Sequence, residues 1–373
     1  MSNDPIKLAQ ELIKFPSVTP IDAGIIDFLI NHLSPFNFSC KKLIFEDVTN
    51  LYACFGVHEP NLCFAGHTDV VPPGSNWSMD PFAAQIIDGK LYGRGACDMK
   101  GAVAAFISAS IEFIQNNNFK GSISFLISGN EEGVADNGTP KVLEYLKANN
   151  QNISHCIVGE PTCPEVLGDM IKYGRRGSVT FNLTINGKQG HVAYPKLADN
   201  PIDILLKILS ELKELKLDSG NEDFDPSNLE ITDITVGNST SNVIPAKAMA
   251  VFNIRFNNLH DADSLEKIIE AICAKYSKNF SLKFEAGAEA FVSSKNSLLV
   301  SHLQKAINTV TGLNPVLSTT GGTSDARFIK DVSQVVEFGL INKTAHHVDE
   351  HVTCQDIIRL KAIYLEFLQN YFK

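Results

Sequence analysis

Short apolar runs alternate with amphipathic segments in the first part of this chain, and that alternation restricts the possible folds. The apolar runs at 62–65, 122–128 and 156–159 have the length of buried strands. Between them, apolar residues recur with helical spacing at 103–114 and around 141–147. Strands that alternate with helices are typical of a mostly parallel sheet covered by helices. The sequence therefore predicts an α/β domain.

A different pattern begins near Gly174 and continues to about residue 288. Strands and helices are expected there in the order β-α-β-β-α-β, at 179–185, 201–215, 229–236, 249–256, 261–276 and 281–285. This order is typical of a ferredoxin-like unit. We therefore expect a mostly parallel-sheet α/β domain of residues 1–176 and 289–373, interrupted by an inserted α+β domain of residues 177–288.

Length and composition exclude several classes of protein. A chain of 373 residues exceeds the ~250–300 at which single cores stop growing, which favours two domains. The net charge of −10, without a long basic run, argues against nucleic acid as a partner. No apolar run approaches the ~20 residues of a membrane span, and no signal peptide is expected. The eight cysteines form no C-x-x-C pair, which favours free thiols and a cytoplasmic location.

Histidines and carboxylates gather at the predicted strand ends and helix starts. They are His67, Asp69, Asp98, Glu131, Glu132, Glu160 and either His346 or His347. Two histidines with several carboxylates suit zinc, cobalt or manganese better than calcium or magnesium. Five ligands exceed the needs of one tetrahedral zinc, but they suffice for two metals ~3.5–4 Å apart that share a carboxylate and activate a water. The pattern predicts metal-assisted hydrolysis.

Each of these residues also has a plain structural interpretation. His67 is equally well a hydrogen-bonded loop residue, Asp98 a helix cap, and Glu131-Glu132 a solvated pair. In an extended His-x-Asp segment, the Asp69 carboxylate is able to accept the second N–H of His67. Of two adjacent glutamates, one is able to bind metal while the other acts as general base, and spacing does not say which.

Four segments together resemble the signature of a known family. They are 66–72 (GHTDVVP), 93–101 (GRGACDMKG), 131–132 (EE) and 159–161 (GEP). In this order they are similar to the zinc aminopeptidase/carboxypeptidase (M20-type) family of two-domain amidohydrolases. Further segments resemble those members that cleave N-succinyl-L,L-diaminopimelate, namely 174–178, 189–195, 241–245, 321–325 and 337–339. The resemblance extends from about Leu8 to the C-terminal helix.

The resemblance implies a two-metal site with defined roles. It implies two Zn²⁺ ions, or Co²⁺ or Mn²⁺ in their place, bridged by Asp98 and held by His67 and Glu160 on one side and by Glu132 and His346 on the other. Glu131 would be the general base, Asp69 would orient His67, and the Asp98–Met99 peptide would be cis. The family pattern Thr-x-His-x-Val-(Asn/Asp)-Glu aligns with residues 344–350, so it selects His346 and leaves His347 as a surface residue.

The resemblance also implies a homodimer formed through the inserted domain, which acts as a lid. His191 would reach the partner's active site and stabilise the oxyanion there. The substrate would be held by Arg175, Tyr194, Asn242, Arg255, Thr323 and Ser324. Arginine suits the substrate's carboxylates because its guanidinium group donates two parallel hydrogen bonds to a carboxylate.

We therefore expect a cytoplasmic amide hydrolase that converts N-succinyl-L,L-diaminopimelate to succinate and L,L-diaminopimelate, on the route to lysine. The alternatives are the same chemistry on another N-acyl amino acid such as N-acetylornithine, or on a dipeptide. A non-catalytic binding protein is a further alternative, and structural histidines and acids without stoichiometric metal are another. The chain departs from the family pattern at Cys97, Thr320, Leu340 and Asp349, none of which is a metal ligand.

Overall fold

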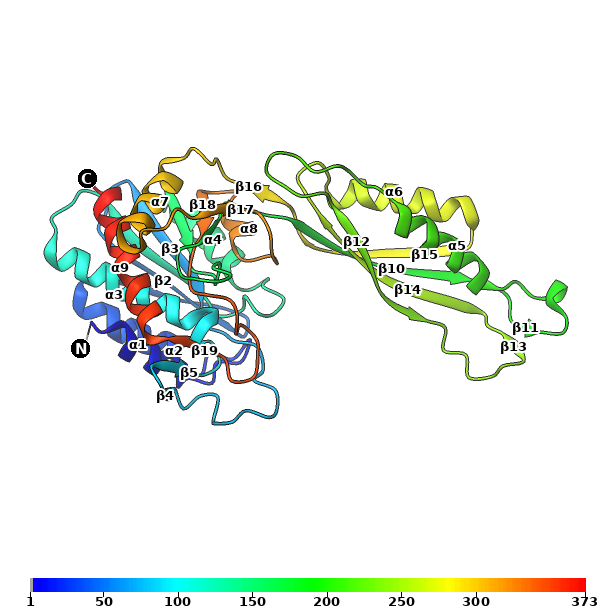
Figure 1. Ribbon diagram of the computed structural model, residues 1–373, viewed down its shortest axis with the longest axis horizontal. Helices are drawn as coiled ribbons and strands as arrows, with labels where there is room; N and C mark the ends of the chain where they lie inside the picture. The colour runs from blue at the N-terminus through cyan, green and yellow to red at the C-terminus, as the bar shows by residue number, and fades with distance from the viewer. Residues whose placement is uncertain (1–2) are drawn as a thin grey trace. The chain divides into compact units, whose positions relative to one another are not determined.

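The structure is a computed structural model that describes residues 3–373, and the chain packs as two compact units. The first unit comprises residues 3–173, Ser293–Ser318 and Ser324–Lys373, and the second comprises Gly174–Val292 and Thr319–Thr323 (Figure 1). The second unit is thus an insertion into the sequence of the first. Its first boundary follows Tyr173, so that residues 174–176 pack with the inserted unit.

An eight-stranded sheet forms the centre of the first unit. In spatial order its strands are β1 (Ser39–Phe45), β2 (Val48–Phe55), β6 (Ser122–Ser128), β3 (Asn61–His67), β7 (His155–Val158), β18 (Gln334–Glu337), β8 (Met170–Lys172) and β17 (Val316–Ser318). Strands β6, β3, β7 and β18 are parallel to one another, whereas β1 and β2 pair antiparallel. Every residue of β3 and β6 is buried, as is typical of strands covered on both faces.

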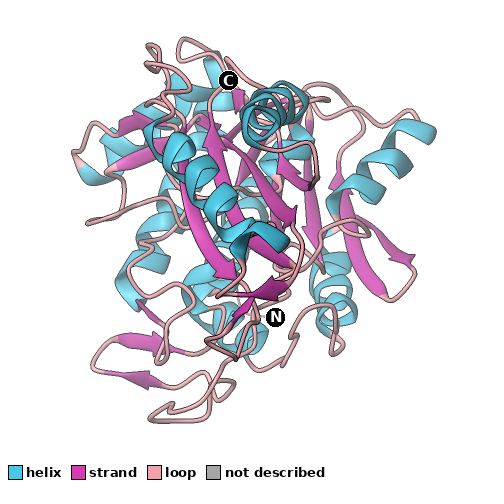
Figure 2. Ribbon diagram, turned by 90° about the vertical axis from the view of Figure 1, so that its right-hand side faces the viewer, coloured by secondary structure: helices cyan, strands magenta, loops and turns pink. Residues whose placement is uncertain are grey.

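Helices cover this sheet, and Figure 2 distinguishes them from the strands. They are α1 (Pro5–Ile13), α2 (Ile25–Leu33), α3 (Gly101–Asn116), α4 (Thr139–Ala148), α7 (Leu298–Thr311), α8 (Ala326–Ile329) and α9 (Cys354–Tyr371), with short turns η1 (Ser34–Phe36) and η2 (Ala96–Lys100). The C-terminal helix α9 packs beside α3 and α7 (Figure 1). The mostly parallel α/β architecture expected from the sequence is confirmed.

A small three-stranded sheet was not expected from the sequence. It consists of β19 (His351–Thr353), β5 (Lys90–Tyr92) and β4 (Ile86–Ile87). Strands of two or three residues show no measurable periodicity, and β5 is defined by its antiparallel pairing with β19, in which His351 faces Tyr92.

The second unit has the predicted β-α-β-β-α-β order. Its elements are β10 (Gly177–Asn186), α5 (Pro201–Glu214), β12 (Asn228–Thr235), β14 (Lys247–Phe256), α6 (Ala262–Tyr276) and β15 (Phe280–Ala288). The four strands form an antiparallel sheet in the order β12-β14-β10-β15. Alternate residues of β14 are buried, because they pack with α5 and α6 in a core that includes Phe181, Phe252 and Ile269.

Short elements complete the second unit. They are β9 (Gly174–Arg175), which pairs with β16 (Phe291–Val292), β11 (Gly190–His191), which pairs with β13 (Val243–Ile244), and the turn η3 (Pro195–Leu197). Among residues 3–373, no helix has the length and apolar character that crossing a membrane requires.

Candidate metal centre

The carboxyl ends of three parallel strands bring the predicted ligands together. His67 is the last residue of β3 and lies beside Ser128, the last residue of β6. Glu131 and Glu132 follow β6, and Glu160 follows β7, whose last residue pairs with Ala65 of β3. Open α/β sheets bind ligands at this edge, so the sequence correctly predicted where these side chains meet.

Asp98 lies at the centre of the cluster, with one carboxylate oxygen toward each histidine. Its Oδ1 is 3.3 Å from His67 Nε2, and its Oδ2 is 3.2 Å from His346 Nε2. Three groups of side chains have ligand atoms within 4.8 Å of one another: His67-Asp98-Glu160, Asp98-Glu132-His346 and His67-Glu131-Glu132. Asp98 belongs to the first two groups, which is the arrangement that a bridging carboxylate requires.

Two glycines leave room for Met99, the residue after Asp98, to pack against the sheet. The Met99 side chain is fully buried, and it packs where the side chains of Gly66 and Gly159 would lie. A Cβ atom would be 2.5 Å from Met99 Cε at Gly66 and 2.6 Å from it at Gly159. The Asp98–Met99 peptide is cis, as the family resemblance implied.

The orientation of His67 differs in one respect from the prediction. Its Nδ1 lies 2.9 Å from the backbone carbonyl oxygen of Asp69, whereas the nearest Asp69 carboxylate oxygen is 3.7 Å away. The carboxylate is engaged elsewhere, because it accepts the backbone N–H groups of Glu131 at 3.1 Å and Glu132 at 3.0 Å. A proton on Nδ1 leaves the Nε2 lone pair of His67 facing the carboxylate cluster.

The two adjacent histidines lie in different environments. His346 Nε2 is 2.9 Å from Glu132 Oε1, and the hydrogen bonds to Asp98 and Glu132 raise the pKa of His346 to about 10. Both side chains are exposed, but within residues 3–373 the metal-type clusters include His346 and not His347. The geometry therefore agrees with the choice of His346 over His347, and its role as a ligand stays a prediction.

The cluster holds more negative charge than its own cations balance. Burial raises the pKa of Glu131 well above its usual range, and the charges of Asp325, Glu132 and Asp98 act in the same direction. Burial also raises the pKa of Glu160, whose Oε1 is buried without a hydrogen-bond donor among the described residues. The cluster thus offers oxygen and nitrogen ligand atoms, an excess of negative charge and a buried oxygen without a hydrogen bond. These properties suit a divalent cation of the zinc type.

The predicted substrate residues fall mostly in the second unit. Pairing of β11 with β13 brings His191 next to Val243, and Val192 N–H donates to the carbonyl of Asn242 at 3.1 Å. The ring of Tyr194 lies 5.8 Å from that of His191, and the Tyr194 side chain is exposed.

The remaining predicted substrate residues occupy three different places. Arg175 is buried and donates to the carbonyl of Thr320 at 3.2 Å, and Thr323 belongs to the same short segment as Thr320. Arg255 lies on β14, opposite Ser178. Ser324 lies in the first unit, where its buried hydroxyl donates to Glu337 at 2.6 Å. Their contacts with substrate stay a prediction.

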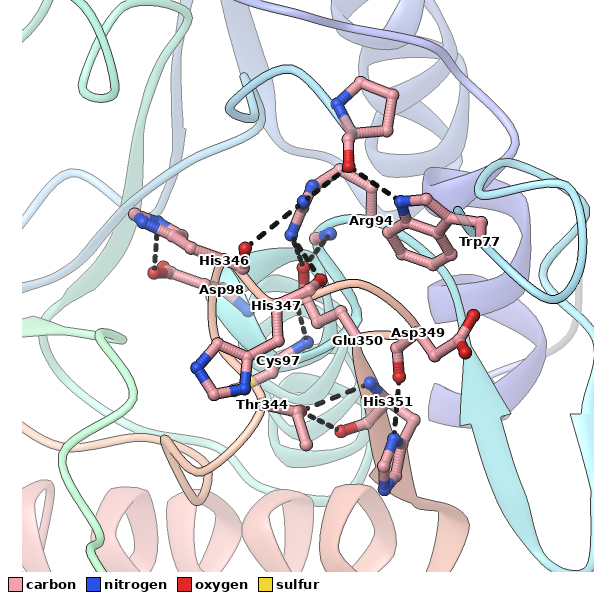
Figure 3. A network of polar contacts seen from close by, with 12 residues as sticks. Trp77, Arg94, Cys97, Asp98, Thr344, His346, His347, Asp349, Glu350 and His351 are labelled. Atoms are coloured by element: carbon pink, nitrogen blue, oxygen red, sulfur yellow. Dashed lines mark hydrogen bonds and ion pairs between the residues drawn. The ribbon is translucent and has the colours of Figure 1, made fainter. Parts of the chain in front are cut away.

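Sequence reasoning missed two buried charged residues beside the ligands. Arg94 and Glu350 form an ion pair of 2.7 Å, and both side chains are almost completely buried (Figure 3). Arg94 stood in a glycine-rich segment and Glu350 at the end of the histidine pattern, and nothing in their spacing of 256 residues linked them. The available signal was that both residues lie within segments that carry the family resemblance, 93–101 and 344–350, where no role was assigned to them.

Two kinds of sequence comparison relate this chain to known proteins. Residues 63–370 match the sequence model of "Peptidase family M20/M25/M40". The succinyl-diaminopimelate desuccinylase of Ehrlichia canis is 52% identical over the whole chain and 99% of its own length, and that of Pelagibacter ubique is 51% identical over 98% of both chains.

Solved structures show the same fold at low sequence identity. The M20 family metallo-carboxypeptidase Sso-CP2 of Sulfolobus solfataricus superimposes with a TM-score of 0.82 at 20% identity, over 100% of this chain and 99% of its own. The Bacillus subtilis YXEP protein, described as a dinuclear metal-binding peptidase, gives 0.72 at 17% identity over 99% and 98% of the two chains. With a match over most of its length and relatives about half identical, this chain belongs to peptidase family M20/M25/M40.

Proposed function

We propose that this chain is a two-metal amide hydrolase that cleaves N-succinyl-L,L-diaminopimelate into succinate and L,L-diaminopimelate. The observation that carries the proposal is the pair of three-residue clusters that share Asp98. The substrate is proposed from the relatives that are about half identical over nearly their whole length, which are named for this reaction. The product would serve the synthesis of lysine.

The proposed ligands divide into two sets around Asp98. His67 and Glu160 would hold one ion, and Glu132 and His346 would hold the other. Two Zn²⁺ ions, or Co²⁺ or Mn²⁺ in their place, would supply Lewis-acid polarisation of the amide carbonyl and a lowered pKa for the attacking water.

Glu131 is proposed as the general base. It would take the proton of the attacking water and deliver it to the leaving amine nitrogen, so that the carboxylate is regenerated in each cycle. Burial, which raises the pKa of Glu131, favours this role because a base works best when its pKa approaches the working pH.

Five residues of the second unit and one of the first are proposed to recognise the substrate. Arg175 and Arg255 would bind its carboxylates, and Tyr194, Asn242, Thr323 and the first unit's Ser324 would complete the site. The active form is proposed to be a cytoplasmic homodimer, in which the partner's His191 would stabilise the oxyanion of the tetrahedral intermediate.

The first test is succinate release from N-succinyl-L,L-diaminopimelate by chelator-stripped protein before and after Zn²⁺ is added back. N-acetylornithine and a dipeptide, assayed beside it, serve as competing substrates. We expect turnover of the succinyl substrate only in the metal-loaded protein. If only N-acetylornithine or the dipeptide is turned over, the proposed substrate is wrong but the proposed metal centre stands. A protein that binds no stoichiometric metal would refute the mechanism.

A further inference from the structure

The carboxylate of Glu350 lies beside the proposed metal centre and accepts hydrogen bonds at both of its oxygens. Its side chain is completely buried. Oε1 accepts the backbone N–H groups of Cys97 at 2.9 Å and Asp98 at 3.1 Å. Oε2 accepts the backbone N–H of Gly95 at 3.1 Å and Nη1 of Arg94 at 2.7 Å. One side chain thus holds three backbone groups of the segment that delivers Asp98.

This segment has little regular structure of its own to fix its path. Within the turn η2, Asp98 (φ −125°, ψ 94°) and Met99 (φ −133°, ψ 27°) have non-helical backbone angles. Backbone N–H groups that leave the helical pattern need other acceptors when they are buried. Glu350 supplies those acceptors, and in doing so it determines where the backbone of Asp98 lies.

Arg94 extends the same network to the loop that carries His346. Besides its ion pair with Glu350, its Nη1 donates to the carbonyl of His347 at 3.3 Å, and its Nη2 is 3.5 Å from the carbonyl of His346 (Figure 3). His346 has a positive φ of 61°, an unusual conformation for a residue other than glycine. The Arg94–Glu350 pair therefore links the segment that carries Asp98 to the loop that carries His346.

The position of the pair follows from the short β5–β19 ladder. Residue pairing of Tyr92 with His351 sets Arg94 just after one strand and Glu350 just before the other. The backbone N–H of Gly93 donates to the carbonyl of Glu350 at 2.9 Å, which continues the ladder. Figure 3 shows Arg94 between Trp77 and Glu350, and its Cζ lies 5.3 Å from the centroid of the indole ring.

We propose that Glu350 is a positioning residue of the metal centre, which holds the backbone of Asp98 and, through Arg94, the loop that carries His346. The inference rests on the proposed two-metal site and adds a residue that touches neither metal nor substrate. It requires a carboxylate in particular, because each of its oxygens accepts two donors. In glutamine one of these oxygens becomes an NH₂ group, which would face two N–H donors and accept neither.

The decisive variant is Glu350→Gln, measured by Zn²⁺ titration of apo protein in competition with a chromophoric zinc indicator. We expect Zn²⁺ affinity per folded molecule to fall about 10- to 100-fold, as when other supporting partners of metal ligands are removed. With N-succinyl-L,L-diaminopimelate, kcat should fall while KM changes little, because Glu350 contacts no substrate. A purely structural ion pair would lower the stability of the apo protein and leave Zn²⁺ affinity unchanged.

The matched control is Asp349→Asn, which removes the same charge one residue away. Asp349 Oδ1 accepts the backbone N–H of Ser78 at 2.9 Å, and asparagine keeps that acceptor. Zn²⁺ affinity should match the wild type in this control. Equal losses in both variants would assign the effect to net charge and overturn the proposal.

A second variant keeps the test decisive if Glu350→Gln does not fold. Arg94→Lys retains the charge opposite Glu350 but provides no second nitrogen for the carbonyls of the His346 loop. We expect weaker Zn²⁺ binding in a folded protein. Wild-type Zn²⁺ affinity in either folded variant would refute the positioning role and leave the proposed hydrolase intact, whereas a wild-type protein without Zn²⁺ binding would refute both.

Discussion

At the scale of single residues, Asp69 organises its neighbours through both its backbone and its side chain. Its carbonyl faces His67 Nδ1, and its two carboxylate oxygens accept the N–H groups of Glu131 and Glu132. Because the side chain is only 1% exposed, these bonds are shielded from water. One acid thus orients a proposed ligand and fixes the backbone of the two glutamates.

The adjacent glutamates should respond differently to substitution. Glu131→Gln is expected to lower kcat about 10²- to 10⁴-fold, because it removes the proposed general base, while the Zn²⁺ content stays at the wild-type value. Glu132→Gln should instead lower the Zn²⁺ content, since Glu132 Oε1 faces His346 Nε2 at 2.9 Å. Metal analysis of both purified variants beside their kinetics makes the comparison. Full activity in Glu131→Gln would exclude it as the base.

At the scale of elements, α2 buries a titratable group away from the metal centre. His32, in its last turn, is 6% exposed and lies between the rings of Phe28 and Phe36, at 6.0 and 6.3 Å between centroids. Burial lowers the pKa of His32 below the model-compound value of 6.5. Below pH 6.5 the unfolded chain therefore takes up a proton at this site before the folded chain does.

Stability should consequently depend on pH through α2. The contribution of His32 is fully present above its unfolded pKa of 6.5 and is lost as the pH falls toward its lower folded pKa. The free energy of unfolding is measured by urea denaturation with chelator present, at about pH 8 and about pH 5.5. Its decrease between the two pH values should be smaller in His32→Phe than in the wild type. The control is His58→Gln, at an exposed position. It should lose as much stability on acidification as the wild type. An equal loss in His32→Phe would show that this histidine does not contribute.

At the scale of the whole molecule, the second unit carries one residue, His191, that the resemblance assigns to a partner's active site. His191 lies on the short β11–β13 pair rather than in the core of its unit. Its Nδ1 accepts the backbone N–H of Ala193 at 3.0 Å. A symmetric homodimer would supply each proposed site with one copy of this residue.

Subunit complementation tests this arrangement directly. Glu131→Ala and His191→Ala chains are expected to be poorly active as separate homodimers. A heterodimer of the two would contain one site with both residues intact, so random co-assembly should restore activity to about a quarter of all sites. Co-expression with two affinity tags isolates the heterodimer for assay. Absence of recovery in a purified heterodimer would place His191 in its own chain's site or remove it from the reaction.

Several conclusions followed from the sequence alone because their signals are local. Apolar runs and helical spacing predicted the parallel sheet and the inserted β-α-β-β-α-β unit, and both are present. The meeting of His67, Glu131, Glu132 and Glu160 was also predictable, since residues that follow parallel strands share one edge of the sheet. The metal-ligand roles came from resemblance, and spacing alone left them open.

Only the tertiary structure decided the features that depend on pairing between distant segments. The Glu350 carboxylate meets the N–H of Asp98 across 252 residues, through a ladder of three-residue strands that carries no periodic signal. The structure also decided that the carbonyl of Asp69, and not its carboxylate, faces His67 Nδ1. Local patterns determine which elements form, but the partner of a buried polar group depends on which donors folding brings within reach.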